Sequence, residues 1–163
     1  MVAHNQVIHK VHYQHTEDEL EGIVKRGGAI LGVKVEEDGA KEIALRSRGT
    51  PRIANRLLKR VRDYCEIKGN GVVDLNSAIK ALSILGVDKQ GLDELDRDII
   101  KAIIENYGGG PVGVETLALM LGEDRRTIEE VYEPYLVKIG YIKRTSRGRM
   151  VTEKAYNHFE IKE

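Results

Sequence analysis

Apolar residues recur at helical spacing through the first half of the chain and predict a small bundle of four helices. Thr16 and Glu19 form a capping-box pattern at the start of the first helix. The expected helices run from Thr16 to about Leu31, from Asp38 to Arg48, from Pro51 to about Ile67, and from Leu75 to Leu85 behind the cap Asp74. Their expected inward residues are Leu20, Ile23, Val24, Ile30, Ala40, Ile43, Ala44, Leu45, Ile53, Leu57, Leu58 and Val61.

The second half shows a different pattern, in which three helices precede two short strands. A polar linker is expected over 87–91, and helices are expected over 93–107, 114–121 and 124–139, the first and third capped by Asp93 and Asp124. Strands are expected over 141–145 and 150–152. The expected inward residues of the helix before them are Ile128, Val131, Tyr132, Tyr135 and Leu136. Three helices followed by a hairpin are typical of a winged helix. The predicted fold class is therefore mainly α, with a helical bundle over 16–87 and a winged-helix domain over 92–163.

Two positions put the predicted helices under strain. Gly27 and Gly28 stand inside the first helix, and each costs about 1 kcal/mol relative to alanine, so a kink or break is expected there. Pro134 stands inside the third helix of the second half, where it is expected to kink the helix or end it early.

Residues 46–62 form a basic segment in which every charge is positive. The Thr50 hydroxyl is expected to cap the helix that starts at Pro51, which places Arg52 in the first helical turn. A cation there opposes the helix dipole, and a bound phosphate would offset this cost. The alternative is an ordinary solvated basic face.

The segment Gly-Thr-Pro-Arg-Ile-Ala-Asn-Arg-Leu-Leu (49–58), followed by Arg-Val-Arg-Asp-Tyr (60–64), resembles the lid of the RuvB family of bacterial Holliday-junction branch-migration motors, which are AAA+ ATPases. The resemblance extends over roughly residues 16 to 162. Further similar segments are Leu-Asp-Glu-Leu-Asp-Arg (92–97), Gly-Gly-Pro-Val-Gly (109–113), Glu-Pro-Tyr-Leu (133–136) and Arg-Thr-Ser-Arg-Gly-Arg-Met-Val-Thr (144–152).

The resemblance implies a nucleotide-sensing role for the lid. It assigns Arg52 to the sensor that reaches the nucleotide phosphates, and it places His15 where the family has a nucleotide-contacting tyrosine. Residues 1–15 resemble a remnant of the last strand of the ATPase core. Intact family members use ATP or ADP with magnesium, assemble as hexamers, and act with the junction-recognition partner RuvA on duplex DNA of Holliday junctions.

The sequence carries no phosphate-binding loop of the form Gly-x-x-x-x-Gly-Lys-Ser/Thr and no acidic strand to hold magnesium. Gly108 to Gly110 do not replace that loop, because no lysine or hydroxyl follows at the right spacing and Pro111 lacks an amide donor. We therefore expect that the chain does not hydrolyse ATP alone, and that it holds no cofactor tightly.

The predicted hairpin is the best DNA-binding candidate. Lys143, Arg144, Arg147 and Arg149 lie on it, and Gly148 permits its tight bend. The resemblance carries DNA contacts onto Arg144 and Arg149, and a further contact onto Arg125. The alternative for all of them is a solubilising role.

Three carboxylates, Glu129, Glu130 and Glu133, lie on the helix before the hairpin. Such a face repels phosphate, so recognition is expected through the DNA backbone and shape, with the hairpin contributing more than the helix.

Composition narrows the remaining possibilities. The net charge is zero, so any nucleic-acid binding must rest on local clusters. The single cysteine, Cys65, excludes a disulfide framework within the chain and is expected to be buried, and no membrane span or secretory signal is visible, so a cytoplasmic location is expected. His9, His12 and His15 lack a carboxylate or cysteine at ligand spacing, so no metal site is predicted.

Two other functions fit parts of the pattern. A free-standing winged-helix transcriptional regulator would explain the hairpin and the missing ATPase loop, with the first helices serving as a dimerisation or effector module. The regulator does not explain the segment around Arg52. The other alternative is a purely structural or protein-interaction module, with DNA bound elsewhere.

Overall fold

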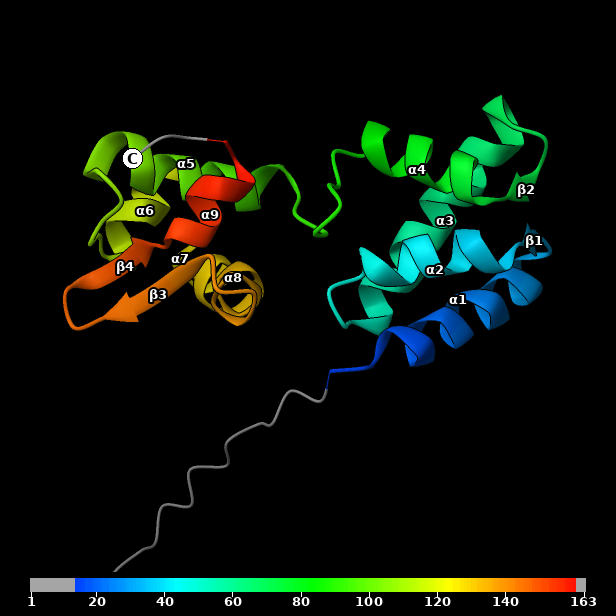
Figure 1. Ribbon diagram of the computed structural model, residues 1–163, viewed down its shortest axis with the longest axis horizontal. Coiled ribbons are helices and arrows are strands. Elements are labelled where there is room, and N and C mark those ends of the chain that lie inside the picture. Colours follow the sequence, from blue (N-terminus) through cyan, green and yellow to red (C-terminus); the bar gives the residue numbers. More distant parts are fainter. Residues whose placement is uncertain (1–13, 161–163) are drawn as a thin grey trace, which may run out of the picture. The chain divides into compact units, whose positions relative to one another are not determined.

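The computed structural model describes residues 14–160 (Figure 1). The expected first strand, with His9 and His12, lies outside the described residues. Contacts between α-carbons divide the chain into two compact units, one ending at Leu82 and the other beginning at Ser83.

The first unit contains the four helices that the hydrophobic pattern predicted. A two-residue parallel strand pair, which was not predicted, joins the loop after the first helix to the loop after the third. Strands of two residues are too short to show an alternating pattern. The elements are α1 (Glu17–Leu31), β1 (Lys34–Val35), α2 (Glu37–Leu45), α3 (Pro51–Lys68), β2 (Val72–Val73) and α4 (Leu75–Ile84).

Two of the three expected caps in this unit are present. The amide of Glu19 donates to Oγ1 of Thr16 at 3.2 Å, which confirms the capping box. The amide of Ser77 donates to Oδ1 of Asp74 at 2.8 Å. The expected Thr50 cap is wrong, because the Thr50 hydroxyl donates to the carbonyl of Arg48 at 3.3 Å and accepts no bond from α3.

The helix α1 runs unbroken through Gly27 and Gly28, so the expected break is wrong. A Cβ on Gly27 would lie 2.8 Å from Cδ2 of Leu58 on α3, and a Cβ on Gly28 would overlap Cγ2 of Val35 on β1. The two glycines therefore let α1 lie close against α3 and β1. This packing offsets their poor helix propensity.

The first unit has an apolar core. Ile30 and Leu45 were expected inside but are 85% and 46% exposed, and α2 ends at Leu45 rather than at Arg48. Cys65 is buried, as expected. The buried apolar residues are Leu20, Val24, Val33, Ala40, Ile43, Ala44, Ala54, Leu57, Leu58, Val61, Cys65, Val73, Ala78, Ala81 and Leu82.

The second unit is a winged helix, as predicted. Its hairpin consists of antiparallel strands, and a short C-terminal helix, which was not predicted, follows it (Figure 1). The elements are α5 (Glu94–Tyr107), α6 (Val114–Leu121), α7 (Arg125–Thr127), the π-helical turn η1 (Ile128–Tyr132), α8 (Glu133–Lys138), β3 (Ile142–Thr145), β4 (Gly148–Val151) and α9 (Glu153–His158).

The π-helical turn explains why part of the third helix faces differently from the prediction. The amide of Glu133 donates to the carbonyl of Ile128, five residues back. Such a turn holds more residues than an α-helical turn, so the inward face shifts after it. Val131, expected inside, is 58% exposed, whereas Glu133 is buried. The helix continues past Pro134 to Lys138, so it does not end early.

The predicted linker over 87–91 packs on the second unit. Oδ1 of Asp88 accepts the amides of Gln90 and Leu92 at 2.8 and 2.9 Å. Oδ2 of Asp88 lies 3.0 Å from Nε2 of His158 on α9. The Tyr135 hydroxyl donates to the carbonyl of Gln90 at 2.5 Å. This segment is therefore held by side chains from α8 and α9.

The glycines after α5 bring the chain against the hairpin. The amide of Val151 donates to the carbonyl of Gly109 at 2.9 Å, and Val112 pairs with Arg149. A Cβ on Gly110 would overlap the carbonyl of Arg149. Only glycine fits at this approach of two backbones.

Candidate nucleic-acid interface

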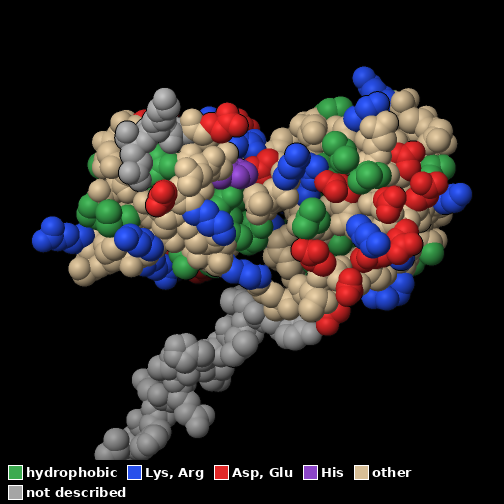
Figure 2. Space-filling model, in the orientation of Figure 1, with side chains coloured by type: hydrophobic (Ala, Val, Ile, Leu, Met, Phe, Trp, Pro, Cys, Tyr) green, Lys and Arg blue, Asp and Glu red, His purple; other side chains and the backbone are tan. Residues whose placement is uncertain are grey.

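The hairpin β3–β4 carries cations on both strands and in its turn. In the strand register, Arg144 lies opposite Arg149, and Lys143 lies opposite Met150. The amide of Arg147 donates to Oγ1 of Thr145 at 3.2 Å, which orders the turn between the strands. Lys and Arg side chains gather over the outer end of this hairpin, at the left of Figure 2.

A buried carboxylate lies between the two facing arginines. The Glu133 side chain is 1% exposed, and its carboxylate accepts hydrogen bonds from Nε of Arg144 and from Nε of Arg149. Nε of Arg149 lies 3.1 and 3.2 Å from the two carboxylate oxygens. Nη2 of Arg149 also lies 3.4 Å from Oε1 of Glu129. Like charges directly opposite each other destabilise a hairpin, and the carboxylate compensates both.

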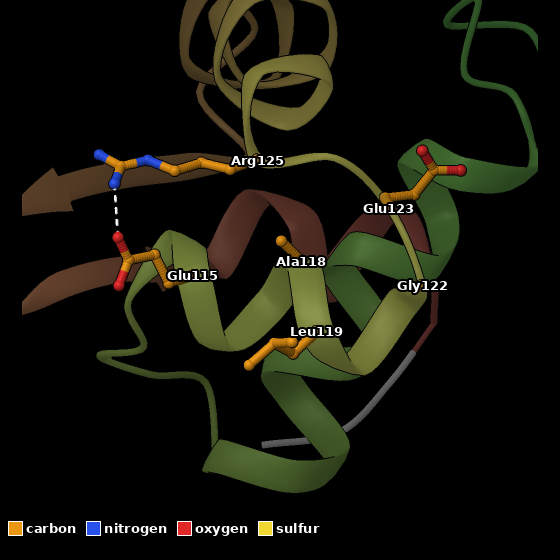
Figure 3. Close-up of a pocket in the computed structure, with 6 residues that line it drawn as sticks. All are labelled: Glu115, Ala118, Leu119, Gly122, Glu123 and Arg125. Atoms are coloured by element: carbon orange, nitrogen blue, oxygen red, sulfur yellow. Dashed lines mark hydrogen bonds and ion pairs between the residues drawn. The ribbon is translucent and has the colours of Figure 1, made fainter.

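Arg125 is also enclosed by carboxylates. Its Nη1 donates to Oε1 of Glu115 at 2.6 Å (Figure 3), and its Nε and Nη2 donate to Glu129 at 3.3 and 3.4 Å. The hydrogen bond and charge of Glu129, with the charge of Glu115, raise the pKa of Arg125 above its ordinary value. Figure 3 shows Arg125 reaching across toward α6, at the edge of a hollow that Leu119 borders.

Lys143 and Arg147 differ from these arginines. Both are exposed, and neither side chain forms an ion pair within residues 14–160. Arg147 borders a groove of about 340 Å³ between the start of α6 and the hairpin turn. The remaining residues that line this groove are Gly113, Val114, Glu115, Thr116, Arg125, Thr145, Ser146, Gly148 and Arg149.

The structure brings the two nucleotide-site candidates of the lid to one region. The backbone amide of His15 donates to the carbonyl of Gly49 at 3.1 Å, directly before Thr50 and the start of α3. Arg52 lies exposed in the first turn of α3. His15 thus lies beside the loop from which the helix carrying Arg52 begins.

The basic segment 46–62 divides into two kinds of cation. Arg46 is 3% exposed and lies 2.6 Å from Glu42, and Arg62 lies 2.8 Å from Asp63. The others on α3 are exposed and have no ion pair in the part of the chain that the structure covers: Arg52, Arg56, Lys59 and Arg60. Spaced at four, seven and eight residues from Arg52, they share one helix face.

The acidic helix differs from the prediction of a face of three carboxylates that repels phosphate. Only Glu130 is exposed among them, whereas Glu129 and Glu133 are paired with arginines. A spacing of four residues between Glu129 and Glu133 was visible in the sequence and puts them on one helix face. Which cations meet that face depends on tertiary contacts.

The fold defines a class of protein: a four-helix lid followed by a winged helix whose hairpin carries exposed cations. A model of the RuvB AAA lid domain matches residues 15–88, and a model of the RuvB C-terminal winged helix domain matches residues 89–160. The chain belongs to the RuvB family and carries these two domains of it.

Individual relatives agree with this assignment. The chain is 71% identical over 154 residues to the Holliday junction branch migration complex subunit RuvB of Fusobacterium nucleatum, covering 94% of this chain and 46% of that protein. The structure of the RuvB Holliday junction branch migration motor of Thermotoga maritima matches with a TM-score of 0.88 at 48% identity, over 92% of this chain and 50% of that one.

A point mutant of the Thermotoga protein matches with a TM-score of 0.89 at 47% identity, over 93% of this chain and 50% of that one. The chain thus spans about half the length of the relatives it matches. Nothing in these matches supports a free-standing transcriptional regulator. Within residues 14–160, no helix is long and apolar enough to cross a membrane.

Proposed function

We propose that the chain supplies the nucleotide-sensing and DNA-gripping parts of an ATP-driven motor that moves Holliday junctions in recombination and repair. The lid domain would comprise residues 16–87 and the winged-helix domain residues 92–163. The relatives described above, a branch-migration complex subunit and a branch-migration motor, support this proposal. The match of this chain to the lid and winged-helix parts of that family supports the division of roles.

The exposed cations at the hairpin carry the DNA part of the proposal. Lys143 and Arg147 have no carboxylate partner in the described region, and Arg144 bonds Glu133 only through Nε, which leaves its two amino nitrogens for a ligand. Arg125 and Arg149 would contact DNA with those N–H groups that are not bonded to the neighbouring glutamates. Such contacts hold phosphate and carry no base code, which suits a motor that moves along any sequence.

The lid would couple the nucleotide state to movement of the motor. Arg52 projects from the first turn of α3 without an ion pair in the described residues, so its charge remains available for the phosphates of ATP or ADP with magnesium in the intact protein. His15, held beside the same helix start, would lie against the nucleotide. Hexameric assembly and the partner RuvA belong to the proposal for the intact protein.

Fluorescence anisotropy of labelled duplex DNA and of a four-way junction, each across a salt series, tests the DNA part. The double variant Lys143→Gln, Arg147→Gln leaves the ion pairs of Glu133 intact. We expect it to bind about tenfold more weakly, with the slope of log K against log salt reduced by about 2, because each lost phosphate contact removes close to one released counterion.

A control with the same change in charge is available on the lid. Lys59→Gln, Arg60→Gln also removes two exposed cations and should leave affinity and slope close to those of the unaltered chain. Binding to neither DNA, or equal effects of the two double variants, would contradict the proposed role of the hairpin.

A further inference from the structure

The hairpin alone is a poor platform for gripping DNA. Its two strands have four residues each, and an isolated two-stranded hairpin is marginally stable in water. Two arginines, Arg144 and Arg149, face each other across it, which weakens it further. Backbone hydrogen bonds join β4 to Gly109 and Val112, and a further group outside the hairpin must fix the direction in which its turn and cations point.

Glu133 meets this need from the helix. Both of its carboxylate oxygens are occupied by arginine donors, and these donors come from both strands, Arg144 from β3 and Arg149 from β4. The Glu133 side chain is 1% exposed, and a buried carboxylate is tolerated only where cations and hydrogen bonds compensate it. One buried group thus ties both strands to α8.

The backbone is shaped to point this carboxylate inward. Glu133 follows the π-helical turn η1, and its amide closes the five-residue bond to Ile128. Val131 lies three residues after the buried Ile128, a spacing typical of one α-helical face, but it is 58% exposed, and Glu133 takes the buried position. The residue whose amide closes the π-helical turn is therefore the same residue that carries the buried carboxylate.

We call the contacts of Glu133 with Arg144 and Arg149 the clamp. The clamp divides the hairpin cations into two groups. Arg149 is held on its inner side, with a side chain 16% exposed, whereas the Arg144 side chain is 55% exposed and is gripped only at Nε. Lys143 and Arg147 remain outside the clamp. The held arginines fix the hairpin and keep only their remaining N–H groups for a ligand, whereas Lys143 and Arg147 are exposed and keep all of theirs.

We propose that Glu133 is a positioning residue for DNA binding: it never touches DNA, but its buried carboxylate holds Arg144 and Arg149 so that the free cations of the hairpin meet neighbouring phosphates. The inference rests on the proposed function of the hairpin. The opposite role, in which Glu133 competes with DNA for the two arginines, predicts tighter binding when its charge is removed.

The variants Glu133→Gln and Glu130→Gln distinguish these roles. Each removes one negative charge from the same helical segment, but Glu130 is exposed and has no ion pair within residues 14–160. Fluorescence anisotropy with labelled duplex DNA across a salt series measures affinity and slope for both. We expect Glu130→Gln to bind as tightly as the unaltered chain or slightly more tightly, because a repulsive charge is gone.

We expect Glu133→Gln to bind about tenfold more weakly than Glu130→Gln, with a salt slope lower by about 1, because misplaced cations contact fewer phosphates. Equal or tighter binding by Glu133→Gln, with an unchanged slope, would overturn the proposal. Circular dichroism and thermal unfolding establish that each variant is folded. If Glu133→Gln does not fold, Glu133→Asp carries the same comparison, because it keeps the charge and shortens the reach.

An NMR measurement separates this inference from the proposed function. Arginine Nε–H signals held by a carboxylate exchange slowly with water, so Arg144 and Arg149 should give protected Nε–H signals that Glu133→Gln abolishes and Glu130→Gln preserves. Loss of protection with unchanged DNA binding would overturn the positioning role alone. Absence of DNA binding by the unaltered chain would instead overturn the proposed function, and the positioning role with it, while the NMR result would still decide whether the clamp exists.

Discussion

The basic helix α3 and the basic hairpin β3–β4 look alike in the sequence and differ in the structure. On α3, four exposed cations from Arg52 to Arg60 share one face and have no ion pair in the described part of the chain. On the hairpin, Arg144 and Arg149 are paired with carboxylates from the neighbouring helix. Only Lys143 and Arg147 resemble the cations of α3.

The difference shows that the number of positive charges in a segment does not tell how many of them are available to a ligand. A free surface cation contributes little to folding and keeps its charge for an external anion. A cation that compensates a buried acid is part of the fold, and its removal leaves an unpaired buried charge. Mutation of a paired cation should therefore lower the stability of the fold, whereas mutation of a free cation should leave stability nearly unchanged and weaken ligand binding.

The largest expected effect is on folding of the second unit. Arg149→Ala leaves the buried Glu133 with one partner fewer and should lower the free energy of unfolding of that unit by about 3 kcal/mol. Arg60→Ala, on α3, should change unfolding of the first unit by less than about 0.5 kcal/mol. Native-state hydrogen exchange measures each unit separately, and similar small losses in both would remove the distinction.

The next effect tests whether a free cation of α3 has an external ligand. In a full-length RuvB family protein that contains these domains, Arg52→Ala should lower ATP turnover at least about tenfold, or 1.4 kcal/mol in the barrier. Arg60→Ala, eight residues along the same face, should leave turnover unchanged. Steady-state phosphate release measures both. Unchanged turnover for Arg52→Ala would make the whole α3 face an ordinary solvated one.

A smaller effect tests the close packing of α1 against β1. Gly28→Ala adds a methyl group that overlaps Val35 and should destabilise the first unit by about 1 kcal/mol, as overpacking exceeds the gain in helix propensity. Gly22→Ala, on the same helix, meets only the flexible Nη1 of Arg26 at 3.3 Å and should stabilise by up to about 1 kcal/mol. Urea unfolding followed by circular dichroism compares the two variants. A change in the free energy of unfolding of the same sign for both would contradict the proposed close packing at Gly28.

The smallest effect concerns the acid that the first unit uses as a cap. Hydrogen bonds from Ser77 hold the pKa of Asp74 below its ordinary value, so the stabilisation is fully present above about pH 4 and is lost as the pH falls below that value through the lowered pKa. Asp74→Asn keeps a capping oxygen without a titrating proton. The stability of this variant should therefore fall less between about pH 6 and pH 3, as thermal unfolding at the two values would show.

Local chemistry made much of the fold predictable. Thr16 with Glu19, Asp74 and Asp93 mark helix starts through bonds that span three residues, and each cap is present in the structure. The apolar stripe of α3 and the segment around Arg52 were equally visible, because helix periodicity and family motifs lie within short stretches of chain. The hairpin was predicted for the same reason.

The failures of prediction have a different cause. Glycines at 27 and 28 are poor helix formers, but the structure places them where α1 meets Leu58 and Val35. Thr50 stands at a cap position, but its hydroxyl turns back to Arg48. In the first case a packing contact and in the second the local backbone conformation decided the structure, and the helix propensity of a residue includes neither.

The sequence by itself determined most of the helices, the caps at which several of them begin, and the family to which the chain is similar, whereas α9 and the pair β1–β2 were not predicted. Only the tertiary structure decided which charges remain free, because Glu133 and Arg149 are sixteen residues apart in the chain and meet only when the hairpin folds onto α8. Their attraction becomes decisive in a buried site, where water no longer screens it. That long-range pairing, rather than the count of arginines, separates the cations that build the winged helix from those left to bind a ligand.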